Sequence, residues 1–306
     1  MAEFFHIKTI SEVHRVFGLE KPKHPLISII RKWPTSDFDF GNVKVISDLY
    51  TLSLKGKTKE DARGSFKYGR NSYDFDEGTL VFMAPNQVVT FDEHVEYESH
   101  GSGWDILFHP DLIRKSPLGK TIKEYSFFDY DANEALHVSD KEKQMLADLV
   151  QRVETELQQN IDKHSQELII LNLESIMTYC HRYYDRQFYT RTNLNSDFVS
   201  KFEAYLKEYF SSADLQDLGL PTVTQCGDAL NMSGPYLSDL LKVETGKSAK
   251  THIHAHIIEK AKTILLNTNN PINTVAYDLG FEYPQHFSKL FKSKTGVSPS
   301  VYRNLN

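Results

Sequence analysis

The sequence predicts a multidomain α+β protein with a β-rich N-terminal part, a helical middle part and an all-α C-terminal part. Three observations predict this class. Short apolar runs broken by turn residues fill residues 26–110, helical periodicity follows from residue 139, and the C-terminal region repeats itself after 50 positions. A chain of 306 residues is also long enough for about two domains that each bury a core.

The N-terminal part predicts strands of about five residues joined by hairpins. Turn-forming residues such as Gly56, Gly64 and Gly78 separate the apolar runs. These runs are 43–46, 50–54, 65–68, 79–83 and 104–108. Strands of this length and spacing fold into a small barrel or sandwich. We therefore expect a β domain over residues 1–130.

Two amphipathic helices are predicted after the β domain, and Ser139 followed by Glu142 marks the first as a capping-box start. The apolar stripes comprise Leu146, Leu149, Val150, Val153 and Leu157 in one helix and Ile169, Leu173, Ile176, Cys180 and Tyr184 in the other. Such stripes belong either to the core or to a dimer contact, and we favour the dimer contact. Residues 131–190 are therefore predicted to be a helical dimerisation segment, followed by a polar linker at 191–197 and a domain at 198–306.

The C-terminal region contains an internal duplication without a gap. Many residues of the first copy recur as identical residues 50 positions later. The identical pairs are Thr224 and Thr274, Asp228 and Asp278, Ser238 and Ser288, Leu240 and Leu290, Lys242 and Lys292, Thr245 and Thr295, Gly246 and Gly296, and Ser248 and Ser298. One structural unit therefore occurs twice.

Each copy predicts a helix, a turn and a second helix. In the first copy Thr222 caps a helix over 223–230, and a helix over 234–244 ends at Thr245-Gly246. In the second copy the helices cover 273–279 and 283–294. A helix over 251–267, about 24 Å long, separates the copies. Two helix-turn-helix units held in this way can enter successive major grooves of DNA if their offset approaches one turn, about 34 Å.

Charge and cysteine content limit the classes of function. The net charge of −6 is uneven, since residues 247–306 hold 8 Lys and Arg against 3 Asp and Glu, as a phosphate-binding surface requires. Cys180 and Cys226 fall in apolar helical patterns, which argues against a disulfide framework. Without a signal-peptide pattern or an apolar run of roughly 18 residues, we expect a cytoplasmic protein that does not bind membranes.

The second copy resembles the signature of the AraC/XylS family of transcription regulators. The resemblance rests on Gly280-Phe281, His286-Phe287-Ser288-Lys289-Leu290-Phe291-Lys292, Gly296-Val297-Ser298-Pro299 and Tyr302-Arg303. The first copy is similar over 236–242 and at Thr245-Gly246, whereas residues 1–190 are similar only in outline to the family's cupin-like sensor and helical dimerisation region. The resemblance implies a homodimeric regulator that binds double-stranded DNA, responds to a small-molecule effector and, as an activator, contacts RNA polymerase.

The resemblance also implies which residues of the second copy read DNA. Gln285, Ser288 and Lys289 share one helix face, next to His286 in the chain. Glutamine suits adenine and lysine suits guanine, so this face is expected to meet base edges. The residues expected to contact phosphate, which positions the protein without specifying sequence, are Lys292, Lys294 and Arg303.

The first copy offers a different set of candidates, namely Tyr236, Ser238, Asp239 and Lys242. Asp239 stands where the family often carries a basic residue. A carboxylate can accept from cytosine but repels phosphate, so we expect a weaker or different base preference in this copy.

Histidines offer candidate metal sites, which we weigh against simpler interpretations. On a helix, His252 and His256 share a face but His254 does not, so we expect a solvated stretch of helix there. His94, His100 and His109 are spaced irregularly and lack the histidine pair and glutamate of metal-binding cupins. We therefore expect no metal, no other cofactor and no enzymatic activity; a cupin-type metalloenzyme fused to a DNA-binding domain is the alternative.

A ligand pocket in the β domain would be built from aromatic residues that face the interior of the barrel. The candidates are Tyr50, Phe66, Tyr68, Phe75, Phe82 and Trp104. Such residues line pockets, but they also fill ordinary cores.

Overall fold

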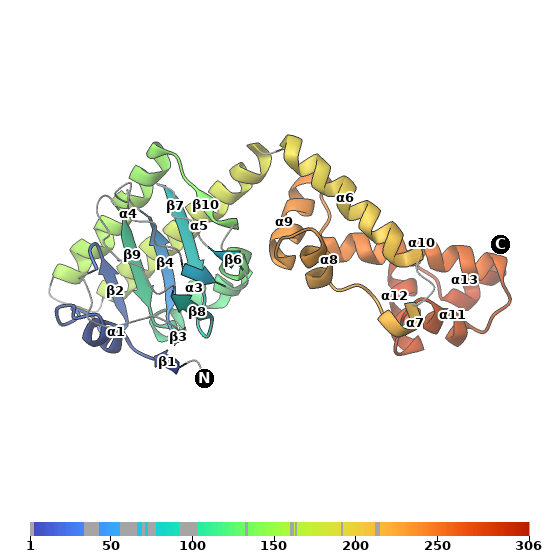
Figure 1. Cartoon of the computed structure of the whole chain (residues 1–306), viewed down its shortest axis with the longest axis horizontal. Coiled ribbons are helices and arrows are strands. Elements are labelled where there is room, and N and C mark those ends of the chain that lie inside the picture. Colours follow the sequence, from blue (N-terminus) through green and yellow to red (C-terminus); the bar gives the residue numbers. More distant parts are fainter. Residues whose placement is uncertain are drawn as a thin grey trace. The chain divides into compact units, whose positions relative to one another are not determined.

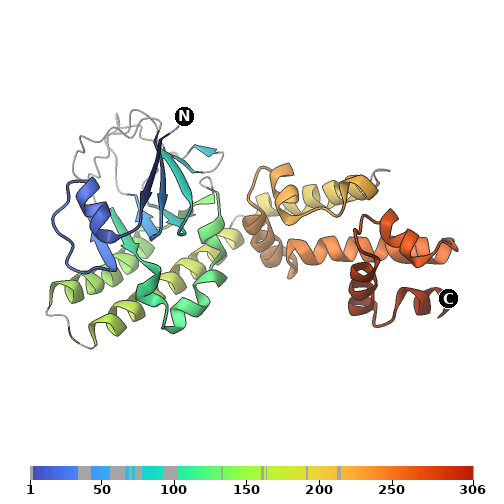
Figure 2. The ribbon, with the colours of Figure 1, turned by 90° about the horizontal axis from the view of Figure 1, so that it is seen from below.

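The computed structural model describes residues 3–305 apart from 34–42, 56–65, 69–70, 73–77, 92–102, 132–133, 160–161, 163, 191 and 212–214. The chain divides into two units, Met1–Gln187 and Phe188–Asn306, which Figure 1 and Figure 2 show from two sides. Each unit buries its own core. Within the described ranges no helix is both long and apolar enough to cross a membrane.

The N-terminal unit contains two five-stranded sheets. The first has the strand order β1 (Glu3–Ile7), β3 (Val43–Ser47), β8 (Val88–Phe91), β5 (Phe66–Tyr68) and β6 (Asn71–Ser72). The second has the order β10 (Leu136–His137), β7 (Thr79–Met83), β4 (Tyr50–Leu54), β9 (Trp104–Phe108) and β2 (Ile27–Ile30). The five predicted strands are therefore confirmed, and β1 and β3 pair in parallel. No strand pairing joins the two sheets among the described residues, so no closed barrel is seen there.

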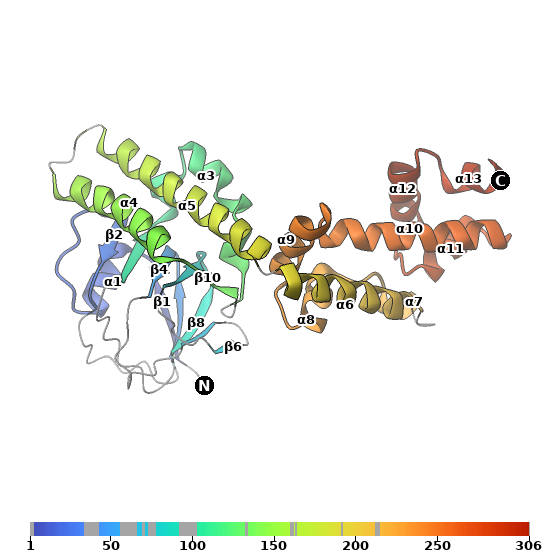
Figure 3. The ribbon, with the colours of Figure 1, turned by 90° about the horizontal axis from the view of Figure 1, so that it is seen from above.

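One face of the second sheet is turned towards helices. In β4, Leu52 lies opposite Phe82 of β7 and Ile106 of β9, so these side chains share a face. The Phe82 ring lies 6.1 Å from that of Tyr184 in α5 (Ser165–Thr190). Figure 3 shows α4 (Asp140–Gln158) and α5 over this face. The opposite side packs with α1 (Ile10–Val16) in a cluster of Ile7, Ile10, Val13, Ile30, Val45, Leu49 and Leu107.

The apolar stripes of α4 and α5 are buried within the single chain. The predicted capping box at the start of α4 is confirmed: Ser139 accepts from the Glu142 N–H, and the Glu142 carboxylate accepts from the Ser139 N–H. Leu146 and Leu173 are 0% exposed, because the helices pack over the apolar face of the second sheet. The stripe residues therefore belong to the core of this unit, so a dimer contact through these helices, which stays a prediction, would have to use other residues.

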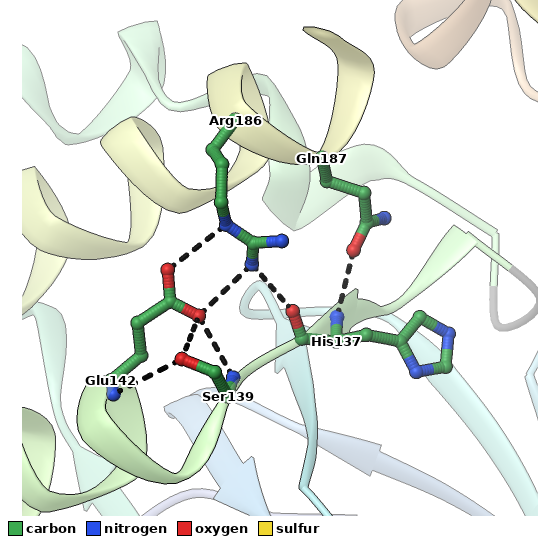
Figure 4. A network of polar contacts seen from close by, with 5 residues as sticks. All are labelled: His137, Ser139, Glu142, Arg186 and Gln187. Carbon is green, nitrogen blue, oxygen red and sulfur yellow. Dashed lines mark hydrogen bonds and ion pairs between the residues drawn. The ribbon is translucent and has the colours of Figure 1, made fainter. Parts of the chain in front are cut away.

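A polar network joins the start of α4 to the end of α5 (Figure 4). The Arg186 guanidinium lies 2.9 Å from one carboxylate oxygen of Glu142 and donates to the other at 3.0 Å. It also donates to the His137 carbonyl at 2.8 Å. Gln187 accepts from the His137 N–H at 2.8 Å and donates to the Ala135 carbonyl at 3.2 Å. These bonds satisfy a buried side-chain amide and fix the last turns of α5 against β10.

The C-terminal unit is built from helices. They are α6 (Thr192–Ser211), α7 (Leu215–Leu218), α8 (Val223–Ala229), α9 (Gly234–Thr245), α10 (Ala249–Asn267), α11 (Ile272–Asp278), α12 (Pro284–Thr295) and α13 (Pro299–Leu305). The residues predicted to form a linker at 191–197 are helical from Thr192 onward. That segment contains no glycine or proline to stop a helix, and Phe202, Leu206 and Phe210 anchor α6 in the core.

Candidate nucleic-acid interface

The duplication read from the sequence is repeated in three dimensions. The pairs α8 and α9, and α11 and α12, are displaced by about 50 residues and end in the same way. Thr245 Oγ1 donates to the Leu241 carbonyl at 2.7 Å, and Thr295 Oγ1 donates to the Phe291 carbonyl at 2.9 Å. The glycine that follows each threonine caps its helix in the left-handed conformation. The second helix of each copy therefore ends in the same Thr-Gly C-cap.

A glycine in each copy permits a close approach of backbone segments, to the turn in the first copy and to α7 (Leu215–Leu218) in the second. A Cβ on Gly227, in α8, would lie 2.6 Å from the Met232 carbonyl oxygen in the turn. In the second copy, Gly280 has a φ of +84°, and a Cβ there would lie 2.8 Å from the Leu215 carbonyl oxygen. Only glycine fits such positions without movement of the backbone.

Helix α10 connects the two copies. Its 19 residues span about 28 Å, and its buried side chains include Ile253, Ile257 and Leu265. Figure 3 shows α8 and α9 at the N-terminal end of α10, and α11 to α13 along its C-terminal half. The two helix-turn-helix copies are therefore held on a common support.

The histidines of α10 belong to this packing. The His252 ring lies 5.9 Å from that of Phe202, and its Nε2 lies 2.7 Å from Thr245 Oγ1. The His256 ring stacks on Phe210. Burial is the main cause that lowers the pKa of each histidine, including His254. The predicted solvated stretch is therefore only partly solvated, because His252 and His256 also pack against α6.

The outer face of α12 is polar and accessible. Gln285, His286, Lys289 and Lys292 are exposed, and Ser288 is half-exposed. The opposite face carries Phe287 and Phe291, which are both 0% exposed. An apolar stripe of this kind anchors one side of the helix in the core and leaves the other side free. The residues predicted to read bases in the second copy therefore lie together on one exposed face.

The equivalent face of α9 is smaller. Lys242 is exposed, whereas Ser238 and Asp239 are half-exposed. Tyr236 is only 8% exposed, and its ring lies 4.9 Å from that of Phe188. The prediction that Tyr236 contacts DNA is therefore not supported, because its side chain forms part of the core.

Comparison with known proteins agrees with this geometry. A family model described as a helix-turn-helix domain matches residues 226–305. The chain is also 33% identical over 84 residues to the xylose operon regulatory protein of Escherichia coli K12, which covers 28% of this chain and 21% of that protein. The arabinose operon regulatory protein of Salmonella typhimurium is 38% identical over 72 residues, with coverage of 24% and 26%. The C-terminal unit carries an AraC-type helix-turn-helix domain.

Among solved structures, the C-terminal domain of AraT, a response regulator from Geobacillus stearothermophilus, is 33% identical with a TM-score of 0.32. The match covers 36% of this chain and 85% of that one. The matched segments span about a fifth to a quarter of the two operon regulators named above. The match therefore covers only a small part of the length of these operon regulators.

Within the AraC-type domain, Arg303 has a structural partner. Its Nε donates to the Leu265 carbonyl at 3.3 Å, and its side chain is partly buried. The contact joins α13 to the last turn of α10, where a positive charge is favourable for the helix dipole. Arg303 therefore has a packing role in this structure, and its contact with phosphate stays a prediction. Lys292 and Lys294 remain exposed in the last turn of α12.

Neither cysteine is placed for reaction. Cys180 and Cys226 are buried thiols without a disulfide. Burial raises the pKa of both, for Cys226 to about 11. A thiol that stays protonated is a poor nucleophile and a poor metal ligand.

The described residues hold no group of three or more His, Cys, Asp and Glu side chains arranged for a metal ion. His94 and His100 lie outside the described residues. His109 caps α2 (Pro110–Ile113) by accepting from the Asp111 N–H at 3.2 Å. No observation therefore favours the metalloenzyme alternative.

The predicted aromatic pocket is not arranged as expected. Tyr50, Phe82 and Trp104 share one face of the second sheet, as the strand registers show, and the contact of Phe82 with Tyr184 shows that this face meets the helices. Phe66 and Tyr68 lie in β5, and Phe75 lies outside the described residues. Tyr50 instead lines a cavity with residues that the sequence analysis missed, among them Lys123, Tyr125, Phe128 and Asp129. The dense aromatic run at 125–130 was the signal that could have indicated them.

Proposed function

We propose that the protein is a sequence-specific DNA-binding transcription regulator of the cytoplasm, without enzymatic activity. The observation that carries this proposal is the exposed face of α12, with Gln285, Ser288 and Lys289 on a helix braced by a buried partner. A helix presented in this way fits the major groove, where side chains meet base edges. The names of the xylose and arabinose operon regulators support transcription regulation as the process.

The two copies would contribute unequally to binding. On α12, Gln285 suits adenine N6 and N7, and Lys289 suits guanine O6 and N7. Lys292 and Lys294 would contact phosphate, which adds affinity without sequence preference. On α9, Asp239 repels phosphate, so this copy would add less affinity.

We further propose that the N-terminal unit is a cupin-like sensor for a small molecule, and that the protein acts as a homodimer. The separate core of this unit and its cavity support a sensing role. Leu168 and Leu171, which are 44% and 51% exposed on α5, support an apolar contact between copies. As an activator, the protein would also contact RNA polymerase. Sedimentation of the full chain tests the homodimer.

The central experiment is selection of duplexes that the full chain retains from a random DNA pool. We expect enrichment of a site with two elements whose centres lie about one helical turn apart. The Gln285→Ala, Lys289→Ala double variant should lose the enrichment while its melting temperature is unchanged. A pool that shows no enrichment with the unaltered chain would contradict the proposal.

A further inference from the structure

A cavity of about 430 Å³ lies in the N-terminal unit, at the first residue of β4. Tyr50, Pro110, Tyr125 and Phe128 line it with flat apolar surfaces. Phe128 lies in η2 (Ser126–Asp129), and Tyr125 immediately precedes it. A volume of roughly 300 to 1,000 Å³ is usual for a small-molecule site. The cavity is open to solvent on one side, and it has the size and the apolar walls to receive an aromatic ring.

Two opposite charges line the same cavity. Lys123, in η1 (Ile122–Glu124), and Asp129, at the end of η2, are both exposed and thus lie at the mouth. Burial and the nearby charge of Asp129 raise the pKa of Tyr50. Its hydroxyl therefore keeps its proton and can donate a hydrogen bond to a ligand. A cation, a carboxylate and stacked rings in one cavity complement a zwitterion with an aromatic body.

We propose that this cavity binds an aromatic α-amino acid as the effector of the regulator, an inference that rests on the proposed function. The ligand ring lies between the aromatic walls, where offset or edge-on contacts are favourable. Its carboxylate pairs with Lys123 and its ammonium group pairs with Asp129. Both pairs are charge-assisted, so both are needed for tight binding.

The walls of the cavity are connected to α5. Phe127 stacks on Tyr184 of α5, with 5.5 Å between ring centroids and 14° between ring planes. Tyr125 meets His181 of α5 edge-on at 6.0 Å. Gln87, in the turn after β7, donates to the Phe128 carbonyl at 2.7 Å. A ligand in the cavity would therefore touch a wall that packs against α5, the helix whose chain continues into the C-terminal unit.

Isothermal titration of the full chain with L-phenylalanine tests the ligand class. Phenethylamine lacks the carboxylate and hydrocinnamate lacks the ammonium group, so each should bind about tenfold more weakly than L-phenylalanine or worse. L-tryptophan and L-tyrosine are titrated as well, since they keep both charged groups and carry a different aromatic ring. Absence of binding by all three amino acids, or binding of either analogue as tight as that of L-phenylalanine, would overturn the proposal.

Substitutions at the mouth test the site. Lys123→Ala and Asp129→Asn should each weaken amino-acid binding about tenfold. The control Lys120→Ala removes an exposed charge of α3 (Pro117–Thr121) that does not line the cavity, and should bind normally. Because all three side chains are exposed, melting temperatures should be retained. Unchanged binding by both mouth variants would refute the site.

The same preparations are then tested on a duplex selected from the random pool. If the protein binds DNA but no amino acid, the proposed ligand is refuted and the proposed regulator function stands. If the protein binds an amino acid but no DNA, the proposed regulator function is refuted and the proposed amino-acid site stands.

Discussion

The ring of His256 lies stacked on that of Phe210, with 5.2 Å between centroids and 20° between planes. One turn earlier on α10, His252 meets Phe202 of the same helix α6. Burial lowers the pKa of both histidines; Lys260 adds to the effect at His256, Lys247 adds at His252, and Glu203 opposes it at both. The contact between α6 and α10 therefore depends on neutral imidazole rings.

We expect the C-terminal unit to lose stability in mild acid. A histidine pKa that is lower in the folded than in the unfolded state gives a stabilising contribution above the ordinary value of about 6.5, which is lost as the pH falls below it. The melting temperature, measured from about pH 8 to about pH 5, should fall on the acid side. The His256→Phe variant keeps a ring against Phe210 without a titrating group, so its melting temperature should fall less. An equal fall would contradict this assignment.

The two copies of the helix-turn-helix can be compared at matching positions. Lys289 and Asp239 stand 50 residues apart in equivalent places. Lys289→Ala should weaken the free energy of binding to the selected DNA site by about 1 to 3 kcal/mol, since it removes a contact to a base. Asp239→Ala should cost less, because it removes a charge that repels phosphate. A quantitative gel-shift titration that gives comparable losses would reject this order.

Phosphate contacts should be visible in the dependence of affinity on salt. Lys292→Ala should weaken binding to all sequences similarly and reduce the slope of log affinity against log salt by about 1. Lys207→Ala, an exposed charge on α6, is the matched control and should leave the slope unchanged. Arg303→Ala should lower the melting temperature, since Arg303 holds α13 to α10, without a comparable change in slope. A loss of slope in the Arg303 variant would show that Arg303 contacts phosphate as well.

Gly280 and Gly296 have the same backbone conformation, so their alanine variants distinguish the cost of backbone strain from the cost of a steric clash. Gly280 and Gly296 both have a φ of +84°, but a Cβ would meet the Leu215 carbonyl oxygen at 2.8 Å only from Gly280. Gly296→Ala should cost about 1 to 2 kcal/mol in free energy of unfolding, from the left-handed conformation alone. Gly280→Ala should cost more, because the backbone of α7 must also move. Equal costs in denaturant unfolding would show that the clash is relieved without penalty.

Features encoded by short stretches of sequence could be predicted. The strand at 50–54, the capping box at Ser139 and the ends of α9 and α12 depend on residues within one turn or one strand of each other. The exposed face of α12 followed from helical spacing in the same way. These are local patterns with a single physical interpretation.

Roles set by distant partners could not be predicted. Tyr236 is buried by Phe188, which lies 48 positions earlier, and Arg303 bonds to Leu265, which lies 38 positions earlier. Nothing near either residue indicates that contact. In the sheet, alternation identified the two faces of β4, but only the pairing of Phe82 with Tyr184 shows which face meets the helices.

The helix α10 sets the distance and the rotation between the two helix-turn-helix copies. Inserting one residue into an α-helix advances everything beyond it by about 1.5 Å and rotates it by about 100°. In the proposed mode of binding, one extra residue in α10 would therefore turn α12 away from its groove, even though every side chain that could touch a base is still present. The length of this helix should therefore matter more to binding than the identity of its exposed residues, and α10 should tolerate substitutions far better than insertions or deletions.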